Sequence, residues 1–180
     1  MAKKSKVPLM LRASFSSTVA EQPSFESVNL DLSAYVDALS GKVLKVNKVT
    51  FISDEGNGLP FDTADFDGSG GGAWTSQLVT GTQTAMKGAN DDRTIAERFS
   101  MFGLTYNSNT PAASGLYFTH YDLDVPEAGF YVAADALTFA VQHRLDADIT
   151  VRHICVIEAE RVKLTAADVN FLLVNQTLTG

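Results

Sequence analysis

The chain has 180 residues, of which 45% are hydrophobic and only 19% are charged, and its net charge is −7. This length fits one domain that can bury a real core, and the acidic balance excludes a protein that coats nucleic acid with its whole surface. A single cysteine excludes an intrachain disulfide and a cysteine-rich metal site, and no apolar run reaches the ~20 residues that a membrane-spanning helix needs.

The first six residues, MAKKSK, contain three of the 14 basic residues and no acidic one. The apolar run that follows, residues 7–11, is too short for the core of a signal peptide, so we expect cytosolic synthesis without one. Lysines on a terminal segment bind phosphates through counterion release, without reading sequence. We therefore expect Lys3, Lys4 and Lys6 to contact nucleic acid, the alternative being a solubilising terminus.

The next segments have the patterns of β-strands. Residues 7–19 look extended, and residues 25–32 place apolar and polar side chains on alternate faces, as in a half-buried strand. Residues 33–39 fit one or two helical turns that Ser33 caps and Gly41 ends. Residues 42–53 are rich in β-branched side chains and predict a long strand, with one bulge where the alternation slips.

Residues 54–72 form the longest expected loop, and their glycine content places them at the surface. Asp62, Asp65 and Asp67 offer the oxygen ligands that Ca²⁺ prefers, but the spacing is not that of an EF-hand, because Trp74 stands where the bidentate glutamate is needed. We keep two interpretations, a structural calcium site between subunits and a solvated acidic loop. The pattern indicates no other cofactor.

The middle of the chain supplies the interface candidates. Residues 73–84 predict a strand anchored by tryptophan, leucine and valine, whereas residues 94–102 fit a helix and a strand equally well. Asp91, Asp92 and Arg93 fit either a salt bridge within a loop or a contact between subunits. In the aromatic strand of residues 116–123, Tyr117 and Tyr121 fit a sugar-stacking platform or, as we favour, a subunit interface.

The last segments predict two more strands and a helix. Residues 130–143 alternate, and in residues 148–162 Ile149, Val151, Cys155 and Ile157 share one face, which predicts a buried cysteine. Thr165 followed by Asp168 is typical of a capping box, so a short C-terminal helix should begin there and lead into a polar tail.

The sequence shows no set of residues for nucleophilic catalysis. The only histidines are His120, His143 and His153, all in or at the end of predicted strands, and no nucleophile elbow or phosphate-binding glycine loop occurs. We therefore expect no catalytic residue and no enzyme.

About eight strands with little helix predict an all-β, single-domain antiparallel β-sandwich, most commonly connected as an eight-stranded jelly roll. We divide the chain into an N-terminal arm at residues 1–22, the sandwich at residues 23–164, and a helix with a C-terminal tail at residues 165–180.

The basic terminus, the extended arm, the eight strand-like runs, the glycine-rich loop and the C-terminal helix together resemble a small viral capsid protein of the single jelly-roll kind. The resemblance spans nearly the whole chain but is architectural and includes no family-specific motif. It implies a self-assembling coat subunit of an icosahedral virus, located in the virion, with copies of itself, other capsid proteins and the genome as partners. The short arm and small domain depart from many such coats and would suit a minor or cementing component. The alternative is a carbohydrate-binding or spike module of a virion.

Overall fold

The computed structural model describes residues 8–19, 24–56, 58–61, 71–106, 113–145 and 149–177. Most of them lie in β-strands. The elements are β1 (Leu9–Val19), β2 (Ser24–Asp31), a 3₁₀ helix η1 (Ala38–Ser40), β3 (Lys42–Asp54), β4 (Gly71–Thr80), β5 (Thr94–Tyr106), β6 (Ala113–Leu123), β7 (Phe130–Val132), β8 (Ala136–Leu145), β9 (Ile149–Lys163) and the helix α1 (Ala166–Thr177).

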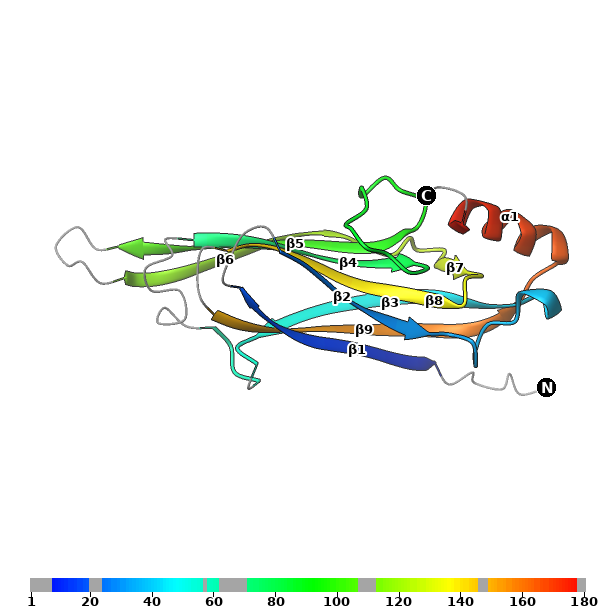
Figure 1. Cartoon of the computed structure of the whole chain (residues 1–180), viewed down its shortest axis with the longest axis horizontal. Coiled ribbons are helices and arrows are strands. Elements are labelled where there is room, and N and C mark those ends of the chain that lie inside the picture. Colours follow the sequence, from blue (N-terminus) through cyan, green and yellow to red (C-terminus); the bar gives the residue numbers. More distant parts are fainter. Residues whose placement is uncertain are drawn as a thin grey trace.

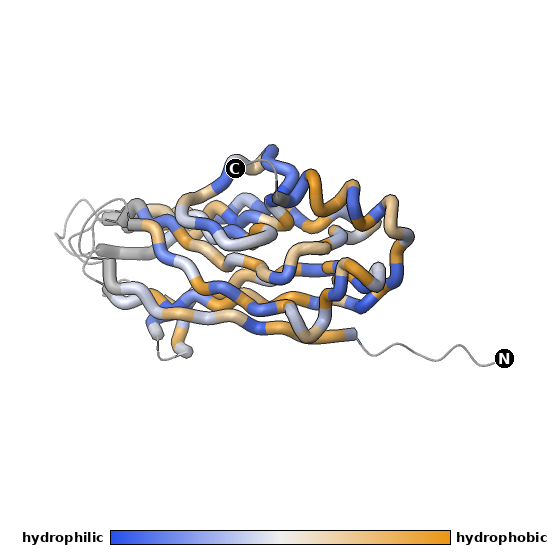
Figure 2. The backbone as a smooth tube through the Cα atoms, turned by 45° about the vertical axis from the view of Figure 1, so that its right-hand side comes forward, coloured by the Kyte–Doolittle hydropathy of each residue, from blue (hydrophilic) through white to orange (hydrophobic). Residues whose placement is uncertain are grey.

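The strands form two antiparallel sheets that lie one over the other (Figure 1). Sheet A has the order β1-β9-β3-β7, and sheet B has the order β2-β8-β4-β5-β6. Apolar and polar residues interleave along the strands (Figure 2), the pattern of sheets that bury one face. The prediction of an antiparallel all-β protein with a short C-terminal helix is therefore confirmed.

The core lies between the sheets. The ring of Phe139 in β8 is 5.3 Å from that of Phe15 in β1 and 5.9 Å from that of Phe51 in β3, so aromatic contacts join the two layers. Val151, Cys155 and Ile157 of β9 are fully buried, as the sequence predicts. Burial also raises the pKa of the Cys155 thiol, which keeps it protonated and unreactive.

Strand β3 contains the predicted bulge. Its register with β9 shifts between Val46 and Lys48, so Asn47 is the extra residue. Before the shift, Leu44 and Val46 point into the core, and after it Phe51 does. The extra residue therefore restores the inward alternation along a strand of 13 residues.

The count of about eight strands is wrong by one, because nine are described. Residues 130–143 are two strands, since the chain leaves sheet A after β7 and enters sheet B at β8. Residues 94–102 belong to a strand. The predicted cap of the short helix is also different, because the carboxylate of Asp37 rather than Ser33 accepts the hydrogen bond from the Ser40 amide, at 3.3 Å.

Both ends of the described chain pack on sheet A. Each of the 11 residues of β1 pairs with β9, so residues 9–19, predicted as extended, form an edge strand of that sheet. At α1 the predicted N-cap is confirmed, because the Thr165 hydroxyl accepts from the Asp168 amide at 3.3 Å. The Asp168 carboxylate accepts from that hydroxyl at 2.6 Å, whereas in a full capping box it would accept from the Thr165 amide. Val169 then packs against Val43 of β3.

Candidate interaction surface

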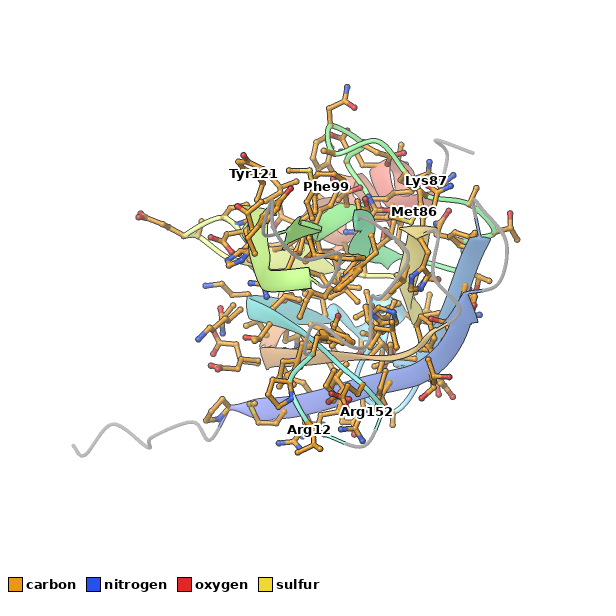
Figure 3. The ribbon with its side chains drawn as sticks, turned by 90° about the vertical axis from the view of Figure 1, so that its left-hand side faces the viewer. Arg12, Met86, Lys87, Phe99, Tyr121 and Arg152 are labelled. Carbon is orange, nitrogen blue, oxygen red and sulfur yellow. The ribbon has the colours of Figure 1, made fainter. Side chains whose placement is uncertain are left out.

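The outer edge of sheet B carries exposed aromatic side chains. Strand β6 is the last strand of this sheet and pairs, among the described residues, with β5 alone. Tyr117, Tyr121 and Leu123 alternate along it and are 55%, 65% and 43% exposed. Tyr121 lies opposite Phe99 of β5, and Figure 3 shows these two side chains on the same side of the sandwich. An apolar edge strand of this kind is a typical site of contact with another chain.

The opposite face of β6 connects this edge to the core. Phe118 is 45% exposed, yet its ring lies 5.4 Å from that of Trp74 and 6.3 Å from that of Phe102. Trp74 itself is only 1% exposed, so it cannot serve as a surface platform for a sugar. The aromatic cluster thus begins in the core and ends at the surface in Phe118.

A groove of about 280 Å³ opens between β6 and β3. Among the described residues, β7 pairs with residues 44–46 of β3, and no described strand of sheet A lies beside the later part of β3 on that side. Its lining combines aromatic, hydroxyl and cationic side chains: Phe51, Ile52, Ser53, Trp74, Arg98, Ser100, Phe118 and His120.

Arg98 bridges the two sheets at this groove. Its Nη1 atom donates to the carbonyl oxygen of Phe51 in sheet A at 2.7 Å, and its other nitrogens donate to the carboxylate of Asp122 in sheet B at 2.7 and 2.8 Å. The hydrogen bond from Arg98 lowers the pKa of Asp122, so the pair stays ionised. The guanidinium is therefore a fixed part of the groove wall.

Two buried histidines form a hydrogen-bonded chain across the core. The Nε2 atoms of His153 in β9 and His143 in β8 are 3.2 Å apart. Ser53 bonds to Nδ1 of His153 at 3.0 Å, and Ser17 bonds to Nε2 of His143 at 2.8 Å. Burial lowers the pKa of His143 to about 4; burial and the neighbouring His143 lower that of His153 to about 3.

The geometry of these hydrogen-bonded side chains fits a structural link between the two sheets. Both rings are fully buried, and at neutral pH both are uncharged, so each ring has one N–H and one bare nitrogen with which to bond its neighbours. Ser53 lines the groove and bonds to Nδ1 of His153. In a catalytic triad the other ring nitrogen would bond to a carboxylate, whereas Nε2 of His153 bonds to His143.

Of the predicted loop candidates, Asp91 and Arg93 pair with each other. The two nitrogens of Arg93 lie 2.9 and 2.7 Å from the carboxylate oxygens of Asp91, whose pKa this hydrogen bonding lowers to about 2. The salt bridge within the loop is thus formed. Asp92 is exposed and lines, with Asp91, a hollow of about 260 Å³.

Two predicted sites lie outside the described residues: the lysines Lys3, Lys4 and Lys6, and the aspartates Asp62, Asp65 and Asp67. Within the described part of the chain, no group of three His, Cys, Asp or Glu residues has the arrangement of a metal site. Over the same residues, no helix has the length and apolar character required to cross a membrane.

Sequence reasoning did not find the pairing of Arg98 with Asp122 or of His143 with His153. The pattern of β9 does hold a signal for the second pair, because His153 falls on the same face as Cys155 and Ile157. A histidine on a buried face needs a polar partner, but the partner lies on the other sheet and the sequence does not name it.

No protein-family model matches the chain, and no curated protein matches its sequence.

Proposed function

We propose that this chain is a self-assembling coat subunit of an icosahedral virus, a structural protein without catalytic activity whose sandwich is a jelly roll. The observation that carries the proposal is the edge of sheet B, where exposed Tyr117, Tyr121 and Leu123 lie on a strand with no described neighbour on its outer side. Such an edge favours association with further copies.

The order of strand pairing supports the jelly roll. With β6 set aside, the first strand pairs with the last (β1 with β9), the second with the next to last (β2 with β8), the third with the sixth (β3 with β7) and the fourth with the fifth (β4 with β5). An antiparallel ribbon folded back on itself in this way contains the two Greek keys of a jelly roll. On this proposal β6 is an added edge strand.

The remaining parts of the proposal concern partners. Copies of the chain, and other capsid proteins, would meet at the β6 edge; Lys3, Lys4 and Lys6 would contact the genome; and Asp62, Asp65 and Asp67 would hold a structural Ca²⁺. The protein would then reside in the virion.

One observation favours the alternative of a carbohydrate-binding module. The groove beside β6 offers the ring of Phe118 and the hydroxyls of Ser53 and Ser100, which suit the apolar face and the polar rim of a sugar. Titration of the unassembled protein with a glycan library distinguishes the two: saturable glycan binding by a small oligomer favours the module.

The interface is tested by changing Tyr117→Lys together with Tyr121→Lys. Both side chains are exposed, so the fold should survive. In every subunit, however, flexible charged lysine side chains would replace the aromatic contact area of the β6 edge. We expect the protein concentration needed for assembly to rise roughly 100-fold or more, as measured by light scattering.

The matched control is Tyr117→Phe with Tyr121→Phe, which keeps the rings and should assemble like the wild type. A folded lysine variant that assembles at the wild-type concentration would remove the β6 edge from the proposed interface.

A further inference from the structure

One end of sheet A carries three cations close together. Lys42 of β3 lies directly opposite Lys163 of β9, and Arg161 is two residues before Lys163, on the same face. Directly opposite residues on paired strands have Cβ atoms ~5 Å apart, and diagonal neighbours ~7–8 Å. With Val162, the three residues line a groove of about 570 Å³.

This arrangement costs stability in the isolated protein. Like charges directly opposite each other in a sheet repel. Lys42 and Lys163 face each other in this way in a chain that has 21 acidic residues. Neither Arg161 nor Lys163 forms an ion pair among the described residues, while Asp37 lies close enough to Lys42 that the lysine helps to lower its pKa. The nearest acid of β9, Glu160, instead pairs with Lys45 at 4.0 Å.

The three cations lie at the end of sheet A where β1 begins. Leu9, the first residue of β1, pairs with Ala159, so β9 continues beyond β1 through Arg161 and Lys163. The sequence that precedes β1, and so joins the sheet at this end, contains Lys3, Lys4 and Lys6. The basic cluster of the folded body thus lies at the end of the sheet where β1 begins.

We propose that Lys42, Arg161 and Lys163 bind the phosphate backbone of single-stranded nucleic acid. Three cations on one face, with Cβ atoms ~5–8 Å apart, can contact neighbouring phosphates of one strand, and binding releases the counterions condensed there. The described lining holds no aromatic ring on which a base could stack, so recognition is independent of base sequence. The inference rests on the proposed function only in that a coat subunit has a genome to contact; binding itself requires no assembly.

The test is fluorescence anisotropy of a labelled single-stranded oligonucleotide, titrated with full-length protein over a range of salt concentrations. The groove variant carries Lys42→Gln, Arg161→Gln and Lys163→Gln. Three lost phosphate contacts should reduce the slope of log K against log[salt] by about 2 and weaken binding at low salt by at least roughly tenfold.

The matched control carries Arg12→Gln, Lys48→Gln and Lys87→Gln, which changes the net charge equally at other places; Figure 3 shows Arg12 and Lys87 on opposite sides of the molecule. We expect its salt slope to stay near that of the wild type. Thermal unfolding of both variants checks the fold, and the groove variant should be no less stable, because a like-charge pair has been removed.

Equal losses in the two variants would overturn the inference, since only overall charge would then matter. An unchanged salt slope for the oligonucleotide in the groove variant would also overturn it. The same holds if the groove variant binds the oligonucleotide normally but no longer binds vesicles of anionic lipid, since the groove would then recognise a membrane surface. Light scattering on the same samples separates the two proposals: assembled shells with an unchanged slope sink the inference alone, whereas a groove-dependent slope in a protein that never assembles sinks the coat function alone.

Discussion

Acidification should destabilise this protein well before its carboxylates are protonated. His143 and His153 are neutral in the fold, with pKa values of about 4 and 3, and titrate near 6.5 when unfolded. Between these values the unfolded chain binds more protons, so the free energy of unfolding falls as pH falls below about 6.5. Each such proton contributes up to about 1.4 kcal/mol per pH unit, and the loss is complete only below the folded pKa values.

The groups around the pair do not relieve this loss. Asp54 raises the pKa of His153, but burial and the neighbouring His143 outweigh it, and Asp54 is itself bonded to Arg152 at 2.7 Å. Protonation of both rings would place two cations about 3.2 Å apart in the core. Urea unfolding at a series of pH values from 7.5 to roughly 4.5 measures the effect.

The variant that isolates the effect is His143→Gln with His153→Gln, which retains polar groups but cannot be protonated. Its stability at neutral pH should be lower, but most of the dependence on pH above roughly 4.5 should be gone. His120→Gln is the control for replacing a histidine by glutamine, because His120 lies exposed on β6, outside the buried pair. A wild-type stability that is flat from pH 6.5 to roughly 4.5 would contradict the buried neutral pair.

Trp74→Ala should be the most destabilising single substitution in sheet B. The indole is 1% exposed, and its ring lies 6.0 Å from those of Phe102 and His153 and 5.4 Å from that of Phe118. Removing it loses the burial of a large ring and leaves a cavity beside the histidine pair. We expect a loss of about 3–5 kcal/mol, a large part of the ~5–15 kcal/mol typical of a domain.

Chemical denaturation of Trp74→Ala and Trp74→Phe measures this difference. The phenylalanine keeps most of the aromatic contact, so its loss should be smaller, at about 1–2 kcal/mol. Similar stabilities for wild type and Trp74→Ala would mean that this aromatic cluster does not support the sandwich.

The local features of the fold could be read from the sequence because each depends on neighbours in the chain. The buried face of β9, the bulge near Asn47 and the helix cap at Thr165 follow from periodicity and from short spacings. The division of residues 130–143 into β7 and β8 could not be read, because both halves alternate and only their membership of different sheets separates them.

The candidate surface was predictable in part. Tyr117 and Tyr121 are exposed, in keeping with their prediction as interface residues, which stays a prediction. The groove, the bridge from Arg98 to Phe51 and the pair of His143 with His153 each join residues of opposite sheets. Such contacts depend on how the sheets stack, and a single sequence does not encode that in any local pattern.

The central claim, that copies of this chain assemble into closed shells, is tested most directly by particle size. Purified full-length protein is measured by multi-angle light scattering and negative-stain electron microscopy, with and without Ca²⁺. Our account predicts closed particles of uniform diameter. A stable small oligomer that neither Ca²⁺ nor a change of salt concentration alters would contradict it.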